Sequence, residues 1–207
     1  MALVDRYAGV IFDYGGVLVE HQSAEDAARL AELAGLRPEV MHDLYWSDRL
    51  AYDKGLVSAE EYWNDMARRA GTTFTAAQIE SLVQADVDSW LKFDASMYAF
   101  AKALGEQGKK IAVLSNMPRE LGETLKAKTR GFEPFAHLTL SYEVHSVKPE
   151  PEIYRHCLEG IGLKPEEALF LDDRLENVRG AERLGIHAVQ FTSPAEMLPK
   201  LDHFSTK

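Results

Sequence analysis

The sequence predicts an α/β protein: a doubly wound parallel sheet with a helical cap domain inserted after the first strand. Short, continuous apolar runs favour strands that are buried on both faces. Helical patterns alternate with these runs, which is typical of a parallel sheet covered by helices. Between residues 20 and 91 the pattern changes to helix signals without a strand. Sheets of this class bind ligands at the carboxyl ends of their strands, so the site is expected there.

Four clear apolar runs predict buried strands, and a weaker run at His137–Leu140 predicts a fifth. The clear runs cover residues 9–12, 111–114, 168–171 and 188–191. Between them the core has three predicted helices. Asp94 is placed to cap the first of these helices and Gly108 to end it, while Gly185 closes the last. The helices cover residues 95–107, residues 149 or 151 to about 160, and residues 174–184.

The inserted segment shows the signals of four helices. Two pairs have the capping-box spacing that marks a helix start, Ser58 with Glu61 and Thr75 with Gln78, and Ser23 with Asp26 is a looser version of it. A helical insert over the mouth of a sheet is typical of a lid. We therefore expect an α/β core formed by residues 1–19 and 92–207 and a four-helix cap formed by residues 20–91.

Composition and charge are those of an ordinary globular protein. The chain has 207 residues, 46% of them hydrophobic, and its net charge of −10 comes without a basic stripe, which argues against a nucleic-acid partner. No run of about 18 apolar residues predicts a membrane span, and no signal peptide is apparent. Cys157 is the single cysteine, so a disulfide framework within the chain is excluded. We expect a cytoplasmic protein, and the sequence specifies no oligomeric state.

Polar side chains follow three of the predicted strands at the point where each ends, and a lysine lies in a loop before a proline. They are Asp13, Ser115 and Asn116, Asp172 and Asp173, and Lys148. Each alone fits a turn, a helix cap or an exposed surface. Because the carboxyl ends of parallel strands share one edge of the sheet, we expect all of them at a single site. Two glycines after Asp13 leave the backbone bare enough for a ligand to approach.

This set of motifs resembles the haloacid dehalogenase superfamily, whose members are mostly phosphatases with a Rossmann-like core. The resemblance covers essentially the whole chain, with the insert in the place of the family's small helical cap. It is strongest to the domains related to the amino-terminal domain of epoxide hydrolases and to bacterial sugar-phosphate phosphatases. The segments that carry it are residues 12–18 (FDYGGVL), 114–116 (LSN), 147–149 (VKP) and 171–177 (LDDRLEN).

The resemblance implies a magnesium-dependent phosphatase that acts on a small phosphorylated metabolite. Asp13 matches the family nucleophile, whose carboxylate attacks phosphorus and forms an aspartyl-phosphate. Because two anions repel each other, a Mg²⁺ ion with oxygen ligands is expected beside them. Asp13, the backbone carbonyl of Gly15 and the side chain of Asp173 match the metal positions.

The remaining motif residues match positions that support the phosphate and the metal. Ser115 and Asn116 match the segment that holds phosphate oxygens. Lys148 matches the residue that pairs with the nucleophile and the phosphate and stabilises charge in the transition state. Asp172 matches a supporting position that holds a metal-bound water or orients the lysine. Asn177, one helical turn further on, matches a second polar supporting position.

The pattern departs from the family at Gly15, where its phosphatases usually carry a second aspartate. That aspartate protonates the leaving oxygen and later activates water, and its loss costs on the order of 10² to 10⁴ in rate for a poor leaving group. Glu20, His21 or a residue of the cap is a candidate replacement. If none replaces it, an activated aryl or acyl phosphate should react much faster than an alkyl phosphate.

Two alternatives remain open at this stage. A 2-haloacid dehalogenase also lacks that aspartate, because halide leaves without a proton, but it works without a metal. The adjacent Asp172 and Asp173 instead favour a bound cation, since adjacent anions otherwise repel. A non-catalytic protein of this fold, binding a phosphorylated ligand or a protein, would also tolerate Gly15. The retained Asp13 and Lys148 argue against it, because buried charges are costly to keep without a use.

Substrate choice is expected to reside in the cap, because the core recognises only the phosphate. Aromatic and basic residues of the insert are the candidates to face the cleft. They are Tyr45, Trp46, Arg49, Tyr52 and Trp63. The alternative is that the aromatic side chains form the hydrophobic core of the cap itself, and this is favoured for Trp63.

Overall fold

A computed structural model describes residues 2–128 and 130–201 of the chain. Its described part contains a five-stranded parallel sheet in the order β3-β2-β1-β4-β5. The strands are β1 (Gly9–Phe12), β2 (Lys110–Ser115), β3 (His137–Leu140), β4 (Ala168–Asp172) and β5 (His187–Gln190). With β1 in the centre and the strand order reversing beside it, the sheet is doubly wound, as the sequence predicts.

The continuous apolar runs account for the strands. β1 and β4 are buried along their whole length, and the predictions at residues 9–12 and 137–140 coincide with β1 and β3. β2 and β4 are slightly longer than predicted. β5 begins one residue before the predicted strand because its register pairs Gln190 with Asp172. Phe191 lies just past this pair, although its N–H still donates to the carbonyl oxygen of Asp172 (2.9 Å).

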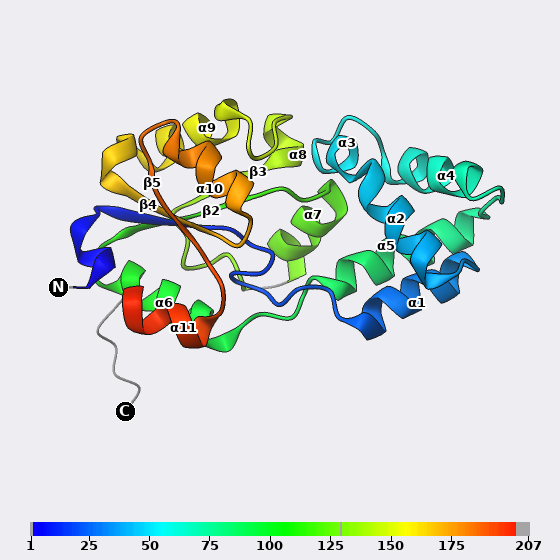
Figure 1. Cartoon of the computed structure of the whole chain (residues 1–207), viewed down its shortest axis with the longest axis horizontal. Helices are drawn as coiled ribbons and strands as arrows, with labels where there is room; N and C mark the ends of the chain where they lie inside the picture. The colour runs from blue at the N-terminus through cyan, green and yellow to red at the C-terminus, as the bar shows by residue number, and fades with distance from the viewer. Residues whose placement is uncertain (1, 129, 202–207) are drawn as a thin grey trace.

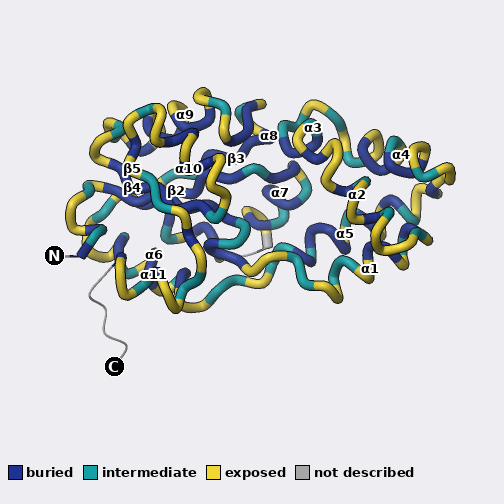
Figure 2. Tube along the Cα trace, viewed as in Figure 1, coloured by how far each residue is buried: buried dark blue, intermediate teal, exposed yellow. Residues whose placement is uncertain are grey.

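Helices cover both faces of the sheet, with α6 and α11 on one side and α9 and α10 on the other (Figure 1). Successive strand residues point to opposite faces, so Val10 and Phe12 join one hydrophobic cluster and Ile11 joins the other. Figure 2 shows the buried inner strands between helices whose outer faces are exposed. The edge strand β5 contains no buried residue, so the prediction of a buried strand there was wrong. The helices of the core are η1 (Leu3–Arg6), α6 (Ala95–Glu106), α7 (Arg119–Lys128), α8 (Ser141–Val144), α9 (Pro151–Ile161), η2 (Pro165–Glu167), α10 (Leu175–Glu182) and α11 (Pro194–Leu201).

The helix boundaries follow the capping signals in the sequence. The carboxylate of Asp94 accepts hydrogen bonds from two backbone N–H groups of α6, and Gly108 takes the left-handed conformation after that helix. α9 starts at Pro151, which decides between the two prolines considered from the sequence, and Gly162 caps its end. α10 covers a shorter range than the predicted 174–184, since Arg174 is its N-cap residue and does not belong to the helix.

The segment between β1 and α6 forms the helices of the cap. They are α1 (Ala24–Ala34), α2 (Pro38–Ser47), α3 (Arg49–Asp53), α4 (Ala59–Arg69) and α5 (Ala76–Ser89). The four longer helices correspond to the four predicted ones. Both expected capping boxes are present, and the looser pair, Ser23 and Asp26, also forms a capping box. The structure adds the short helix α3, so the count of four was wrong. The exact domain limits, residues 1–19, 20–91 and 92–207, stay a prediction.

Two neighbouring segments connect the core to the cap. Val19 and Phe93 form an antiparallel bridge, and the N–H of Glu20 donates to the carbonyl oxygen of Lys92 (3.0 Å). The exit from the core and the return to it therefore lie side by side. Among the described residues, no helix combines the length and the apolar character needed to span a membrane.

Candidate active site

The register of the sheet brings the polar strand ends together. Phe12 pairs with Val113 on one side and with Leu171 on the other. The next residue, Asp13, donates its N–H to the carbonyl oxygen of Leu171 (2.8 Å) and therefore emerges beside the end of β4. Asp13, Ser115 and Asp172 thus meet at the carboxyl edge of three adjacent strands, where parallel sheets bind their ligands.

A buried ion triad occupies this edge. The ammonium nitrogen of Lys148 lies 2.7 Å from Asp13 Oδ1 and 2.7 Å from Asp172 Oδ2. The lysine side chain is only 1% exposed, so both contacts are screened little by water. Asn177 donates to both carboxylate oxygens of Asp172, at 3.0 and 3.1 Å. The lysine therefore bridges two carboxylates, and Asn177 holds one of them, Asp172, in place.

Burial and the neighbouring charges shift the protonation equilibria of this triad. Burial raises the pKa of Asp13 well above its usual value, although the Lys148 ammonium opposes that shift. Burial would also raise the pKa of Asp172, but Lys148 and the backbone N–H of Arg174 hold it below its usual range. The two carboxylates together raise the pKa of Lys148 in spite of its burial. Asp13 is thus the carboxylate whose charge most needs a further positive partner.

The loop that carries Lys148 is fixed by the residue after Ser115. The amide of Asn116 donates to the carbonyl oxygen of Lys148 (3.1 Å) and accepts from its N–H (2.8 Å). This pair of hydrogen bonds sets the position of the lysine next to the nucleophile candidate. Ser115 is buried at the end of β2. The sequence placed Asn116 among the phosphate-binding residues; in this structure its amide is engaged with the lysine loop.

Three carboxylates form a group that is able to hold a metal ion. One oxygen each from Asp13, Asp172 and Asp173 lie within 4.8 Å of one another. Asn177 Oδ1 is buried there without a hydrogen-bond partner among the described residues, so an acceptor is left for a metal-bound water. Oxygen donors of this kind suit Mg²⁺. The imidazole of His21 lies at the rim of the group, 3.4 Å from Asp173 Oδ2.

A cavity of about 600 Å³ opens above these groups. The core contributes Asp13, Gly15, Ser115 and Lys148 to its wall. The residues that the cap contributes are His21, Trp46, Arg49, Leu50, Asp53 and Trp90. The cap therefore closes over the sheet edge and takes part in the same cavity, as a lid would.

Gly15 marks the position where the family's usual second aspartate is absent, and an indole lies beside it. A Cβ atom built on Gly15 would come within 3.3 Å of Trp90 Cζ3. A side chain at this position would therefore require the Trp90 ring to move by a few tenths of an ångström. The next residue, Gly16, adopts the left-handed conformation with φ of 71°, which is strained for any residue that has a Cβ atom.

The aromatic candidates of the cap divide into two groups. Trp63 is fully buried in the hydrophobic cluster of the cap, as the sequence favoured. Tyr45 and Tyr52 are buried in the same cluster. Trp46 is 46% exposed and lines the cavity. Of the aromatic side chains considered, Trp46 is thus the one available to a ligand.

Arg49 lines the cavity but is already neutralised within the cap. Its Nε lies 2.9 Å from Asp53 Oδ1 and its Nη1 lies 2.8 Å from Asp86 Oδ2. Its guanidinium also lies 4.6 Å from the centre of the Tyr45 ring. Sequence reasoning missed both carboxylates. The four-residue spacing of Arg49 and Asp53 on a helix was the signal available for one of them, whereas the contact with Asp86 depends on the cap fold.

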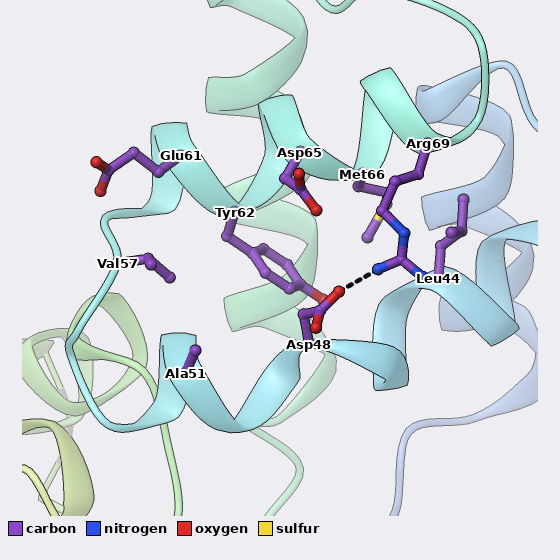
Figure 3. Close-up of a pocket in the computed structure, with 9 residues that line it drawn as sticks. All are labelled: Leu44, Asp48, Ala51, Val57, Glu61, Tyr62, Asp65, Met66 and Arg69. Atoms are coloured by element: carbon purple, nitrogen blue, oxygen red, sulfur yellow. Dashed lines mark hydrogen bonds and ion pairs between the residues drawn. The ribbon is translucent and has the colours of Figure 1, made fainter.

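A second, smaller cavity of about 220 Å³ lies entirely within the cap (Figure 3). Tyr62 and Met66 form its apolar wall, and an ion pair between Asp48 and Arg69 crosses it. None of the residues at the sheet edge lines it. This cavity is therefore a gap between cap helices and is separate from the site around Asp13.

Comparison with known proteins connects this geometry to a family. Residues 7–185 match the haloacid dehalogenase-like hydrolase family. The chain is 23% identical over 186 residues to the sesquiterpene phosphatase astK of Aspergillus oryzae, covering 90% of each protein. It is 29% identical over 195 residues to a glyceraldehyde 3-phosphate phosphatase of Methanopyrus kandleri, covering 87% of this chain and 82% of that protein. Two longer relatives also match, of which the chain spans only 35% and 19%.

The fold is shared with solved structures as well. A haloacid dehalogenase family enzyme from Bacteroides thetaiotaomicron, in a complex with magnesium and inorganic phosphate, superimposes with a TM-score of 0.73. The two chains are 22% identical, and the match covers 89% of this chain and 93% of the other. A Rossmann-like core with an inserted helical cap and a carboxylate site at the sheet edge defines the class. The chain belongs to the haloacid dehalogenase-like hydrolase family.

Proposed function

We propose that this protein is a Mg²⁺-dependent phosphatase that hydrolyses a small phosphorylated metabolite through an aspartyl-phosphate at Asp13. The observation that carries the proposal is the buried contact of Lys148 with both Asp13 and Asp172 at the edge of the sheet. A lysine between a nucleophilic carboxylate and a supporting one neutralises a phosphoryl group where it is transferred. The names of the phosphatase relatives support the reaction class.

The residues of this chain have separate roles in the proposed reaction. An oxygen of Asp13 attacks phosphorus and the ester oxygen leaves, so that the phosphoryl group is held as an acyl phosphate. Lys148 and Ser115 contact its oxygens and stabilise the charge of the transition state. Water then attacks the acyl phosphate, which releases inorganic phosphate and restores the Asp13 carboxylate.

The cluster of three carboxylates, Asp13, Asp172 and Asp173, fits Mg²⁺. The ion would be held by Asp13, the carbonyl oxygen of Gly15 and Asp173. Its charge would bring the anionic substrate to the anionic carboxylate. Asp172, held by Asn177, would orient Lys148 and the metal ligands next to it. Since burial raises the pKa of Asp13, a cation beside it also favours the ionised, nucleophilic form. The solved relative that contains magnesium and phosphate supports this choice of cofactor.

A phosphate-release screen tests the proposal. Purified protein is assayed against a panel of sugar phosphates, other small phosphomonoesters and 2,4-dinitrophenyl phosphate, with Mg²⁺ or with EDTA. The wild type should release phosphate only with Mg²⁺, and Asp13→Asn should abolish release while keeping a native circular dichroism spectrum. Absence of release across the panel, with Mg²⁺ binding intact, would instead indicate a binding protein. Halide release from 2-haloacids in EDTA would indicate a dehalogenase.

A further inference from the structure

The cavity contains one carboxylate from the cap in addition to those of the core. Among the described residues that line it, four carry carboxylates. Asp13 and Asp173 belong to the proposed nucleophile and metal groups. Glu176 is exposed and pairs with the side chain of Arg174 at the surface. Asp53, at the end of α3, is the remaining one, and it is buried.

The backbone of Asp53 is tied to the segment that follows Ser115. The hydroxyl of Ser141 donates to the carbonyl oxygen of Asp53 (2.5 Å) and accepts from the N–H of Met117 (2.9 Å). A single buried hydroxyl thus bridges the cap and the proposed phosphate-binding segment. On the next residue, the ammonium of Lys54 pairs with a carboxylate of the core at 2.6 Å. These contacts seat the end of α3 at the sheet edge.

Only one of the two carboxylate oxygens of Asp53 has a hydrogen-bond partner among the described residues. This oxygen, Oδ1, accepts from Arg49 Nε. Burial raises the pKa of Asp53 to about 6, against the opposing charge of Arg49. That value already includes the charge of Asp86, which raises the pKa, and that of Arg174, which lowers it. A carboxyl group in this range is able both to give and to take a proton near neutral pH.

We propose that Asp53 is the general acid and base of the reaction and supplies from the cap the proton that the core cannot supply at Gly15. This inference rests on the proposed phosphatase function. As Asp13 attacks and the bond between phosphorus and the ester oxygen breaks, Asp53 transfers its proton to that oxygen and the alcohol leaves. As water attacks the acyl phosphate, the Asp53 carboxylate takes a proton from it, and phosphate and free Asp13 are released.

This assignment makes the seated cap a condition of catalysis. Asp53 shares the cavity with the proposed nucleophile because α3 is docked on the core through contacts that include those of Ser141 and Lys54. In a phosphatase with the acid on the core, cap closure mainly excludes water. In this chain, closure would also deliver the proton donor, so that turnover of esters with poor leaving groups would depend on it.

The test compares leaving groups in Asp53→Asn, which preserves an oxygen acceptor for Arg49. With ethyl phosphate, whose alkoxide needs a proton, kcat/KM, which reports the steps up to phosphorylation of Asp13, should fall by about 10² to 10⁴. With 2,4-dinitrophenyl phosphate, whose phenolate needs none, kcat/KM should change by less than about threefold, while kcat should fall because the loss of the base slows hydrolysis of the acyl phosphate. Turnover of the activated ester by the same preparation shows that the variant is folded. Equal losses of kcat/KM on both esters, or a rise in KM alone, would show a positioning or binding role and overturn the assignment.

Asp86→Asn is the matched control. Asp86 pairs with the same arginine as Asp53 but does not line the cavity. Because Asp86 helps to raise the pKa of Asp53, the comparison is made at pH 5, where a lower pKa matters least, and there this variant should keep the wild-type ratio of kcat/KM for the two esters to within about threefold. If it shows the same selective loss as Asp53→Asn, charge balance around Arg49 explains the effect and the proposal fails.

The pH profile provides a second readout. The ratio of kcat/KM for ethyl phosphate between the wild type and Asp53→Asn cancels the ionisation of the substrate. With the pKa of Asp53 near 6, its protonated fraction falls from roughly 90% at pH 5 to roughly 1% at pH 8. The ratio should therefore fall steeply through this range. A flat ratio would contradict proton donation by Asp53.

The wild type separates this inference from the function on which it rests. If it does not release phosphate even from 2,4-dinitrophenyl phosphate with Mg²⁺, the phosphatase function itself has failed. If it cleaves the activated ester, its sensitivity to the leaving group should be weak at pH 5 and steep at pH 8, because only protonated Asp53 assists departure. Steep sensitivity at both pH values would overturn the role of Asp53 without affecting the phosphatase assignment.

Discussion

Replacement of Lys148 by methionine tests the electrostatics of the site most severely. The ammonium is 1% exposed and lies 2.7 Å from each of two carboxylates. Methionine has a similar length but no charge, so Asp13 and Asp172 would be left buried and facing each other. Removing one partner of a buried ion pair costs about 3 to 5 kcal/mol. That is a large share of the roughly 5 to 15 kcal/mol by which a typical domain is stable.

The assay is urea unfolding followed by circular dichroism and tryptophan fluorescence, at neutral pH with EDTA. Lys54→Met is the matched control, because Lys54 pairs with a single, partly exposed glutamate and should cost less than about 1 kcal/mol. Addition of Mg²⁺ should increase the free energy of unfolding of Lys148→Met more than that of the wild type, because a cation would replace the lost charge. If Lys148→Met is as stable as Lys54→Met in EDTA, the lysine does not neutralise buried carboxylates and the proposed site is wrong.

Three further predictions concern the cap and the rim of the cavity. Trp63→Ala removes a fully buried side chain from the cap cluster, so unfolding experiments should show a loss of about 3 to 5 kcal/mol. Trp46→Ala removes a half-exposed side chain and should cost less than about 1 kcal/mol. In steady-state kinetics it should raise KM more than it lowers kcat; unchanged KM for every substrate would remove Trp46 from the binding site. Gly15→Asp, which requires a small shift of Trp90, should increase ethyl phosphate turnover by less than about threefold, because Asp53 already supplies the proton. A gain of about 10² or more would mean that no other acid is present.

The meeting of the core residues was predictable from the sequence. Asp13 and Asp172 follow continuous apolar runs, and the parallel register of β1 and β4 brings the ends of these two strands together. The position of Lys148 also followed from the family pattern. Its contacts with both Asp13 and Asp172, and the two hydrogen bonds between Asn116 and its backbone, could not be predicted because they depend on the conformation of the loop.

The cap residues were less predictable because their orientation depends on docking. The sequence indicated that aromatic side chains either fill the cap or face the cleft, and the structure separates Trp63 from Trp46 on that basis. Asp53 had no signal of its own beyond its spacing from Arg49. Its place in the cavity results from the hydrogen bonds of Ser141, which join segments far apart in the chain. No periodicity or local motif encodes a contact of that kind.

The central claim is that the carboxylate of Asp13 accepts a phosphoryl group next to a bound cation. A crystal structure of the protein with Mg²⁺ and beryllium fluoride, a mimic of an acyl phosphate, tests it directly. We expect beryllium bonded to a carboxylate oxygen of Asp13, fluorides near Lys148 and Ser115, and a cation held by Asp173. An unmodified Asp13 with no cation beside it, in crystals that bind the reagent elsewhere or not at all, would contradict the claim.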